Sequence, residues 1–419
     1  MCCVALRNLT LRNFTQFYTA NHSNAVPAKN PFEFGRELSG TELVDREEEL
    51  ATVVRTMEQG GRLFLIGPRR FGKTSILRAA TEQAEAEGVV VLRHDAEAYP
   101  ALRLLAEAVV AEAARRLTGT VERAGKKLRE FFGALRPQIS FNPLDNTFSA
   151  SLTTEASAPE ATLLTAVLDG LDRMAGDAGR RVAVVIDEFQ QVVEQGGSGG
   201  GVIAERQLRA VVQQHDHVAY VFAGSKTSLL TEMTGDPSRP FYRLGARLFI
   251  GPVPRADFAR FLQGGFETAG FEIEEDAITA ILDLAEDVPY NVQRLAHECW
   301  NYLRDHQGER MSEKLEAADV RSVLERLVRR DDPFYTQTWN RLTATQQKAL
   351  LALVGGSGQG LFAKEVLRTY GLPLSTMRTA LEALVKVGIA RQEEALGSVR
   401  LRLEDPFFAA WLRLFVAAP

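Results

Sequence analysis

The chain begins with a polar stretch and then alternates short apolar runs with helical patterns. Residues 1–29 are polar and irregular and predict no regular element. Strands buried on both faces of a sheet are short continuous apolar runs, whereas amphipathic helices repeat apolar residues every three or four positions. The alternation of the two patterns predicts an α/β fold with a parallel sheet over residues 30–252. The strand pattern occurs at 62–66, 89–92, 182–186 and 218–222, and the helical pattern at 73–86 and 102–117.

Three further patterns lie inside and after this predicted domain. Alternating apolar and polar residues on either side of the turn-forming residues 142–146 predict a β-hairpin insertion within about 118–160. Glycine dominates residues 196–201, a composition typical of a flexible loop. After Pro252 the strand pattern stops and helical spacing takes over, so we expect a helical domain over residues 253–333.

The last part of the chain has a different order of elements. Three helices followed by a two-stranded wing are typical of a winged helix, which we expect over residues 334–419. Lys and Arg outnumber Asp and Glu by ten to six from residue 341 onward, a modest local excess of four positive charges. The helical patterns cover 342–354, 361–370 and 374–387, and the strand patterns cover 389–393 and 399–403.

Composition is that of a globular protein from a reducing compartment. Of the 419 residues, 45% are hydrophobic and 25% are charged, close to the averages of folded proteins. The formal net charge of -5 gives no global basic field for nucleic acid. Three cysteines fit neither a disulfide framework nor a four-ligand zinc site. The first residues make a poor signal peptide, and no apolar stretch reaches the roughly 20 residues that span a bilayer. We therefore expect a cytoplasmic protein without membrane contact.

The strongest chemical signal is the phosphate-binding pattern GxxxxGK[ST], between the first predicted strand and the next helix. Glycines let backbone amides turn toward phosphates, and the helix N-terminus adds positive potential. Lys73 would neutralise the β- and γ-phosphates of ATP, while Thr74 would be a ligand of Mg²⁺. A chain of this length contains the pattern by accident about one time in a hundred, which disfavours an ordinary glycine turn. The residues are Gly67, Pro68, Arg69, Arg70, Phe71, Gly72, Lys73 and Thr74, with Ser75 next in the helix.

Two carboxylates follow the predicted strand at residues 182–186. Ligands of open α/β sheets bind at the carboxyl ends of the strands, so Asp187 and Glu188 are expected beside the phosphates. Asp187 would hold Mg²⁺, directly or through water, and Glu188 would orient and deprotonate the attacking water. The alternative is an acidic pair that only caps the next helix.

A third polar strand end, Ser225, follows residues 218–222. Its hydroxyl would lie beside Glu188 and sense the γ-phosphate if this strand runs between the other two. A serine at this position is equally suited to cap a helix over residues 226–233, and the sequence leaves both interpretations open.

Together these features resemble the AAA+ superfamily of P-loop ATPases. The resemblance is carried by the glycine-rich loop, the Asp187-Glu188 strand end, the polar Ser225 strand end, and a helical lid followed by a winged helix. Over about residues 30–415, the chain is also similar to the prokaryotic, archaeal-type predicted ATPases allied to the STAND branch. The segments that carry this second resemblance are Asn30-Pro31-Phe32, Leu43-Val44-Asp45-Arg46-Glu47, Phe71-Gly72-Lys73-Thr74 and Arg239-Pro240-Phe241-Tyr242-Arg243.

The second resemblance implies contacts with the adenine. In that family the segment that corresponds to Val44, Asp45 and Arg46 lies near the base, although a charged helix N-terminus explains these residues equally well.

AAA+ proteins commonly complete the site with an arginine from a neighbouring subunit. The resemblance assigns this role to Arg243, with Arg239 and Arg247 as rivals, and implies self-association in the ATP state. Many relatives also place a second sensor arginine in the lid, where this chain has residues 287–290 and Arg294 only a turn later. That departure favours a slow nucleotide-driven switch over a motor.

Three functions are compatible with these features. The first is an ATP- and Mg²⁺-dependent ATPase with slow turnover, whose winged helix is the output module. The second is a DNA-associated initiator or loader, in which basic residues of the winged helix would contact duplex phosphates, although many winged helices bind a protein instead. The third is a nucleotide-binding scaffold with little turnover, and the presence of Glu188 argues against it. The basic residues of the second function are Arg378, Lys386, Arg400 and Arg402.

Overall fold

The computed structural model describes residues 29–118, 121–142, 147–153, 160–195, 201–306, 314–356, 358–395 and 398–416. It divides into two compact units, one of residues Glu37–Pro252 and one of Val253–Pro419 together with the residues up to Arg36. The irregular segment expected at 1–29 lies outside the described residues except for its last position, and so does most of the glycine-rich loop at 196–201. Among the described residues, no helix is both long and apolar enough to span a bilayer.

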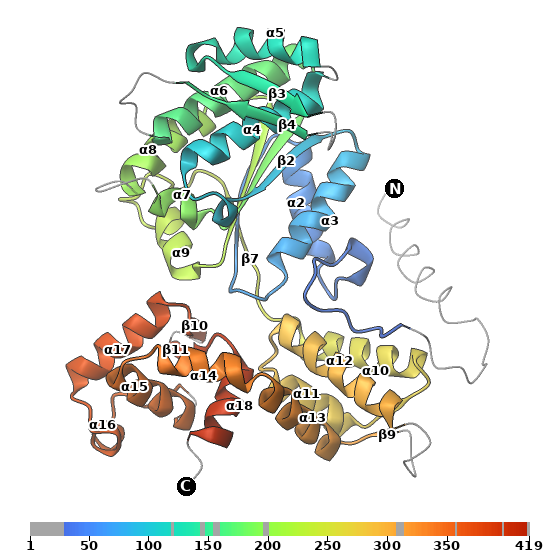
Figure 1. Cartoon of the computed structure of the whole chain (residues 1–419), viewed down its shortest axis with the longest axis vertical. Helices are drawn as coiled ribbons and strands as arrows, with labels where there is room; N and C mark the ends of the chain where they lie inside the picture. Colours follow the sequence, from blue (N-terminus) through green and yellow to red (C-terminus); the bar gives the residue numbers. More distant parts are fainter. Residues whose placement is uncertain are drawn as a thin grey trace, which may run out of the picture. The chain divides into compact units, whose positions relative to one another are not determined.

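The unit Glu37–Pro252 is built on a parallel five-stranded sheet (Figure 1). Every position of β5 and β6 is buried, as their continuous apolar sequence predicts for strands covered on both faces. All four neighbouring pairs are parallel, which confirms the predicted fold class. The strand order is β2 (Val90–Asp95), β5 (Val182–Asp187), β6 (Val218–Gly224), β1 (Arg62–Ile66) and β7 (Ala246–Phe249).

Helices cover both faces of this sheet. On one face α2 (Glu47–Glu58) and α3 (Lys73–Ala86) pack together, and on the other face alternate strand residues form one apolar core with three helices. These three are α4 (Leu102–Thr118), α6 (Glu160–Ala178) and α8 (Gly201–Val212). The unit also contains α7 (Gln190–Glu194), α9 (Thr227–Gly235), and the short 3-10 helices η1 (Gly40–Glu42), η2 (Ala96–Ala98) and η3 (Gly133–Leu135).

A helix and a hairpin are inserted between α4 and α6. Helix α5 (Val121–Phe132) precedes β3 (Gln138–Asn142) and β4 (Thr147–Ser151), which pair in antiparallel fashion beside α4 and α5 (Figure 1). Most of the predicted turn, residues 143–146, lies outside the described residues.

The second unit is mainly helical, but the expectation that strands stop after Pro252 until the wing is wrong. Strand β8 (Glu272–Ile273) pairs with β9 (Lys314–Leu315) in parallel. Two residues are too few to produce an alternating pattern, so these strands left no signal in the sequence. The helices that precede the C-terminal part of the unit are α10 (Arg255–Thr268), α11 (Glu275–Leu284), α12 (Pro289–Asp305), α13 (Ala317–Arg330) and α14 (Asp332–Asn340).

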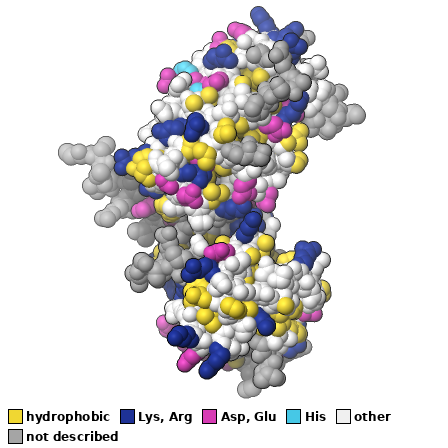
Figure 2. Space-filling model, turned by 90° about the vertical axis from the view of Figure 1, so that its left-hand side faces the viewer, with side chains coloured by type: hydrophobic (Ala, Val, Ile, Leu, Met, Phe, Trp, Pro, Cys, Tyr) yellow, Lys and Arg dark blue, Asp and Glu magenta, His cyan; other side chains and the backbone are white. Residues whose placement is uncertain are grey.

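Three helices, a strand pair and a last helix complete this unit. Helices α15 (Ala344–Gly355), α16 (Lys364–Tyr370) and α17 (Leu374–Lys386) precede β10 (Ala390–Ala395), which pairs in antiparallel fashion with β11 (Ser398–Leu403). The apolar face of α18 (Pro406–Phe415) packs against α13. Large hydrophobic side chains are also exposed, among them Phe362 and Val387, and Figure 2 shows such side chains scattered between Lys and Arg.

Polar contacts join the C-terminal part of this unit to the helices before it. Arg402 donates to Glu286 at 2.8 Å, and Asn291 donates to Asp405 at 3.2 Å. The indole Nε1 of Trp411 donates to Asp332 at 2.8 Å. The segments 253–333 and 334–419, which were predicted as separate domains, are therefore joined to each other by hydrogen bonds within one unit.

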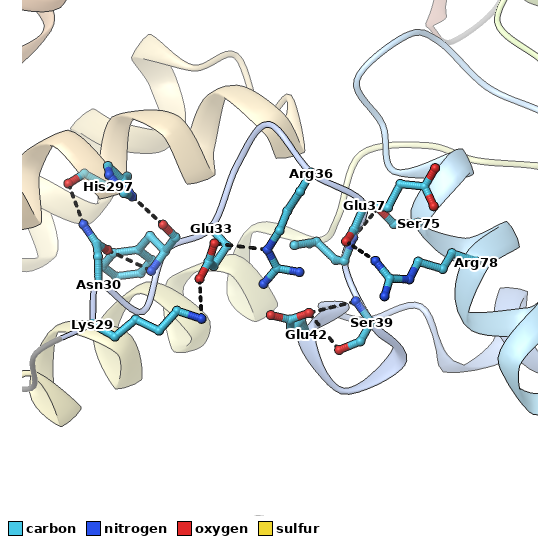
Figure 3. Close-up of polar contacts among 12 residues, drawn as sticks. Lys29, Asn30, Glu33, Arg36, Glu37, Ser39, Glu42, Ser75, Arg78 and His297 are labelled. Carbon is cyan, nitrogen blue, oxygen red and sulfur yellow. Dashed lines mark hydrogen bonds and ion pairs between the residues drawn. The ribbon is translucent and has the colours of Figure 1, made fainter. Parts of the chain in front are cut away.

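The N-terminal residues of the second unit are anchored on α12 and α10 (Figure 3). The Asn30 amide donates to the His297 carbonyl at 3.0 Å, and a ring nitrogen of His297 lies 2.6 Å from the Phe32 carbonyl oxygen. The Phe32 ring is fully buried between Phe261 and Phe266. A Cβ on Gly265 would lie 2.6 Å from this ring, so the glycine makes room for it.

The next residues belong to the sheet unit, where they contact α3 (Figure 3). The Leu38 amide donates to the Ser75 hydroxyl at 3.0 Å, and Arg78 donates to the Glu37 carbonyl at 3.0 Å. Ser39 and Glu42 then close a capping box around η1. The helix that begins with Lys73 is thus held from its outer side by residues 37–42.

Candidate functional site

The glycine-rich loop connects β1 to α3, as its position in the sequence predicts. Gly72 precedes the helix with a φ of 88°, a left-handed conformation that glycine adopts without strain. A Cβ on Gly67 would lie 2.8 Å from both the Cβ and the carbonyl oxygen of Ile250, so a larger residue would displace the neighbouring chain. Lys73 is buried, and its ammonium donates to the Pro68 carbonyl at 3.0 Å. The loop thus turns its lysine back over its own backbone at a helix N-terminus, which is suited to bind an anion.

The remaining loop residues have distinct surroundings. Arg69 and Arg70 are exposed, and Arg69 lies 3.5 Å from Glu97. Phe71 is buried in the core, and Ser75 accepts the Leu38 amide described above. These two residues hold the loop and helix in place, whereas the two arginines face solvent.

Asp187 at the end of β5 lies beside the loop. It is almost fully buried, and the Thr74 hydroxyl donates to its Oδ2 at 2.8 Å. Burial raises the pKa of Asp187, and the hydrogen bond from Thr74 and the charge of Lys73 oppose that rise. Neither Asp187 nor Glu188 caps α7, which begins without a side-chain cap.

A hydroxyl and a carboxylate in contact are hard oxygen donors that fit Mg²⁺. Magnesium is usually held by one or two protein ligands together with substrate phosphates and water, rather than by a full protein cage. The described residues include no group of three or more His, Cys, Asp or Glu that could hold a metal.

Glu188 lies at the same edge, held by two side chains. Its φ is 50°, an unfavourable left-handed conformation for a residue with a side chain. The Ser225 hydroxyl donates to Glu188 Oε2 at 2.7 Å, and the Gln190 amide donates to the same oxygen. Strand β6 runs between β5 and β1, which meets the condition under which the sequence places Ser225 beside the acidic pair. The cap position of α9 belongs to Lys226, so the Ser225 side chain does not cap that helix.

The residues that the resemblance places near adenine lie before α2. Val44 is half-buried, and Asp45 is exposed with a φ of 49°. Arg46 is buried, and its guanidinium donates to Glu49 at 2.8 Å and to the Gly251 carbonyl at 2.5 Å. Arg46 therefore ties the start of α2 to the end of the sheet unit, and its guanidinium is engaged by protein groups.

The arginines considered for action in trans differ in their partners. Arg239 donates to the fully buried Glu205 and to Glu232. Arg243 and Arg247 are exposed, and the Arg243 guanidinium lies 5.0 Å from the centre of the Tyr242 ring.

In the other unit, Arg294 is paired with Asp331 and packs over Phe407. This pairing engages the arginine that lies nearest in sequence to the second sensor position of AAA+ relatives.

The motifs of the sequence assigned no role to Gln190, whose side chain the structure places against Glu188. The available signal was a polar residue two positions after the acidic pair, where an apolar residue would suit a buried helix start. The sequence also did not predict that Gly224, just before Ser225, leaves space for that amide.

Comparison with known proteins identifies one family and solved structures that share the fold of this chain. Residues 43–295, more than half of the chain, match a family described as an ATPase domain predominantly from Archaea. No curated protein sequence matches the chain.

Two solved structures share the fold of most of the chain. The Walker-type ATPase PABY2304 of Pyrococcus abyssi is 21% identical, with a TM-score of 0.58, and the match covers 91% of this chain and 99% of that one. The ORC2 protein of Aeropyrum pernix, in ADPNP and ADP complexes, is 14% identical, with a TM-score of 0.51 and coverage of 93% and 99%. The phosphate-binding loop, the acidic strand end and the family match agree, and the chain belongs to the family of P-loop ATPase domains found predominantly in Archaea.

Proposed function

We propose that this ATPase depends on Mg²⁺ and acts as a slow, nucleotide-driven switch whose output module is a winged helix over residues 334–419. One observation carries the proposal: at one edge of the sheet, Thr74 contacts Asp187 while Ser225 contacts Glu188. The metal site and the base for water thus lie on adjacent residues of a single strand end. Such an arrangement suits phosphoryl transfer from ATP to water.

Each residue has a role in this mechanism. The amides at the start of α3 and the Lys73 ammonium bind the β- and γ-phosphates. Thr74 and Asp187 would hold Mg²⁺, which neutralises charge on the phosphates when bound. Glu188 takes a proton from the water whose oxygen attacks the γ-phosphorus, while the bond from that phosphorus to the ADP oxygen breaks. The Ser225 hydroxyl, which contacts Glu188, would sense the γ-phosphate.

Slow turnover and self-association have separate support. Arg294 is engaged by Asp331 and is therefore not poised as a second sensor, which favours a switch over a motor.

Arg243 is exposed and has a φ of 55°, an unfavourable conformation of the kind that accumulates at functional sites. We propose that Arg243 completes the site of a neighbouring copy in the ATP state.

The decisive experiment compares Glu188→Gln with wild type in ATP binding and single-turnover hydrolysis. Glu188→Gln should bind ATP normally but hydrolyse it at least ~100-fold more slowly, because the base is lost. Glu194→Gln is the matched control, since this exposed carboxylate pairs with exposed Lys226 at the surface. Equal hydrolysis by wild type and Glu188→Gln would remove the catalytic assignment.

Asp187→Ala should instead weaken Mg²⁺-dependent affinity, and an unchanged Mg²⁺ titration would place the metal elsewhere.

Duplex DNA is the alternative partner of the C-terminal module, because Arg378 and Lys386 are exposed on α17. Arg402 does not support this alternative, since Glu286 and Glu393 both accept from it. If the two exposed residues each contact a phosphate, reversing both to Glu should flatten the logarithmic salt dependence of binding by about 2. Fluorescence anisotropy of a labelled duplex with the full chain tests this, and no binding at low salt would leave a protein partner. Co-purification with ATP-bound Glu188→Gln protein would then identify it.

A further inference from the structure

Gln190 occupies a buried position that connects the two polar strand ends. It is the first residue of α7, and its side chain is fully inaccessible to solvent. Its amide nitrogen donates to Glu188 Oε2 and lies 3.4 Å from the Ser225 hydroxyl oxygen, which itself donates to the same carboxylate oxygen. The three side chains form a closed triangle of hydrogen bonds beside Asp187.

This position is unfavourable for an amide on grounds of stability alone. The Gln190 Oε1 is buried and has no hydrogen-bond partner among the described residues. A buried polar atom without a partner loses its hydration and gains nothing in return, so such atoms in folded proteins need an explanation. Phe189, which precedes Gln190, and Leu230, which lies with the amide beside Gly224, are both buried, and an apolar side chain would suit these surroundings better.

The backbone beside Gln190 also accommodates this amide. A Cβ on Gly224 would lie 2.2 Å from Gln190 Oε1 and 2.5 Å from Leu230 Cδ1. The φ of Gly224 is not positive, so the backbone conformation at this position does not require glycine. Glycine is required instead because the Gln190 amide occupies the space that a Cβ would take.

We propose that Gln190 is a positioning residue for hydrolysis, which holds the Glu188 carboxylate in place independently of Ser225. A serine hydroxyl has a single proton to donate, so Ser225 cannot donate to Glu188 and to a γ-phosphate at once. When Ser225 turns toward the phosphate, Gln190 retains the carboxylate beside the attacking water. This inference rests on the proposed role of Glu188 as the base.

The test replaces Gln190 by Met, which keeps the length of the side chain but removes its donor. Gln190→Met should lower kcat about tenfold or more, because a misplaced base transfers the proton less often. KM for ATP should stay within about twofold, since the loop that binds phosphates is untouched. The thermal midpoint should stay the same or rise, because an unsatisfied amide is replaced by an apolar group. The matched control is Gln191→Met in the same helix, which should leave kcat unchanged.

A double-mutant cycle with Glu188→Gln separates the possible outcomes. If Gln190 acts through Glu188, Gln190→Met should have no further effect on kcat in the Glu188→Gln background. A wild-type kcat for Gln190→Met, alongside a slowed Glu188→Gln, would overturn the inference and leave the proposed function intact. An equal loss in both backgrounds would also overturn it, because Gln190 would then act elsewhere. Wild-type turnover in Glu188→Gln would instead defeat the proposed function itself.

Discussion

Replacing Arg239 by alanine should destabilise the sheet unit, whereas replacing Arg243 should not. The two arginines belong to the same short segment, but among the residues that the structure describes only Arg239 pairs with a buried carboxylate. Its guanidinium donates to Glu205, whose side chain is 0% exposed, and to Glu232 at 2.6 Å. Arg243 is exposed and packs over the Tyr242 ring.

The size of the destabilisation follows from the Glu205 carboxylate, which stays buried without a cation when Arg239 is removed. Removing one partner of a buried pair costs about 3–5 kcal/mol. Glu205 can avoid the full cost by taking up a proton, which at pH 7 costs about 3.7 kcal/mol for an ordinary pKa of about 4.3. We therefore expect Arg239→Ala to lose about 3 kcal/mol of unfolding free energy at pH 7.

The same reasoning fixes the sign of the pH dependence. Burial raises the pKa of Glu205 in the folded protein above its value in the unfolded chain, even with Arg239 present. The contribution of Glu205 to stability is therefore complete below the pKa of the unfolded chain and is lost as the pH rises through the pKa of the folded protein. Without Arg239 the rise in pKa should be larger. At pH 5.5 the cost of protonation falls to about 1.6 kcal/mol, so the deficit of Arg239→Ala should shrink accordingly.

Native-state hydrogen exchange of peptides from β5 and β6 is the appropriate assay. All three tryptophans, Trp300, Trp339 and Trp411, lie in the other unit, so tryptophan fluorescence would not report on this one directly. A loss of 3 kcal/mol should accelerate globally protected amides about 100-fold at pH 7, and less at pH 5.5. Arg243→Ala should leave protection unchanged. Equal protection in Arg239→Ala and wild type at both pH values would refute the argument from the buried pair.

Three further predictions concern other parts of the chain. Phe32→Ala should cost about 3–5 kcal/mol in the second unit, seen as a lower midpoint of the tryptophan fluorescence transition, because the ring fills the space beside Gly265. Gly67→Ala should weaken ATP binding in a calorimetric titration, since its Cβ would collide with Ile250 and shift the loop. Cys299 is fully buried, and burial raises the pKa of its thiol, so it should resist alkylation in native protein and react after unfolding, as peptide mass spectrometry can follow.

The central sheet could be predicted because its signals are local. The run at 62–66, the glycine-rich loop and a helical pattern follow one another without interruption, and the structure has β1 and α3 at the expected residues. Asp187 and Glu188 were identifiable for the same reason, since a buried strand that ends in carboxylates brings them to the edge where parallel strands end. β7 was missed, because most of its four residues are exposed and give no apolar run.

Contacts between distant residues were beyond the reach of sequence patterns. The resemblance placed Arg239 and Arg243 side by side as candidates for action in trans, and nothing in their segment shows that Glu205 is buried and requires a cation. Thirty-four residues separate Arg239 from that partner. The glutamate lies in α8, where a polar residue within an amphipathic helix would ordinarily face solvent.

Local charge counts fail for the same physical reason. The excess of four positive charges from residue 341 onward suggested a surface for duplex DNA, but a count does not register what each cation already contacts. Arg402 lies between Glu393 on the paired strand and Glu286, 116 residues earlier in the chain. Releasing it to a phosphate would leave both carboxylates without their cation, so part of any gain in DNA affinity would be cancelled. The exposed cations of α17 remain available, which is why reversing Arg378 and Lys386 tests DNA binding more directly than a change in the overall charge.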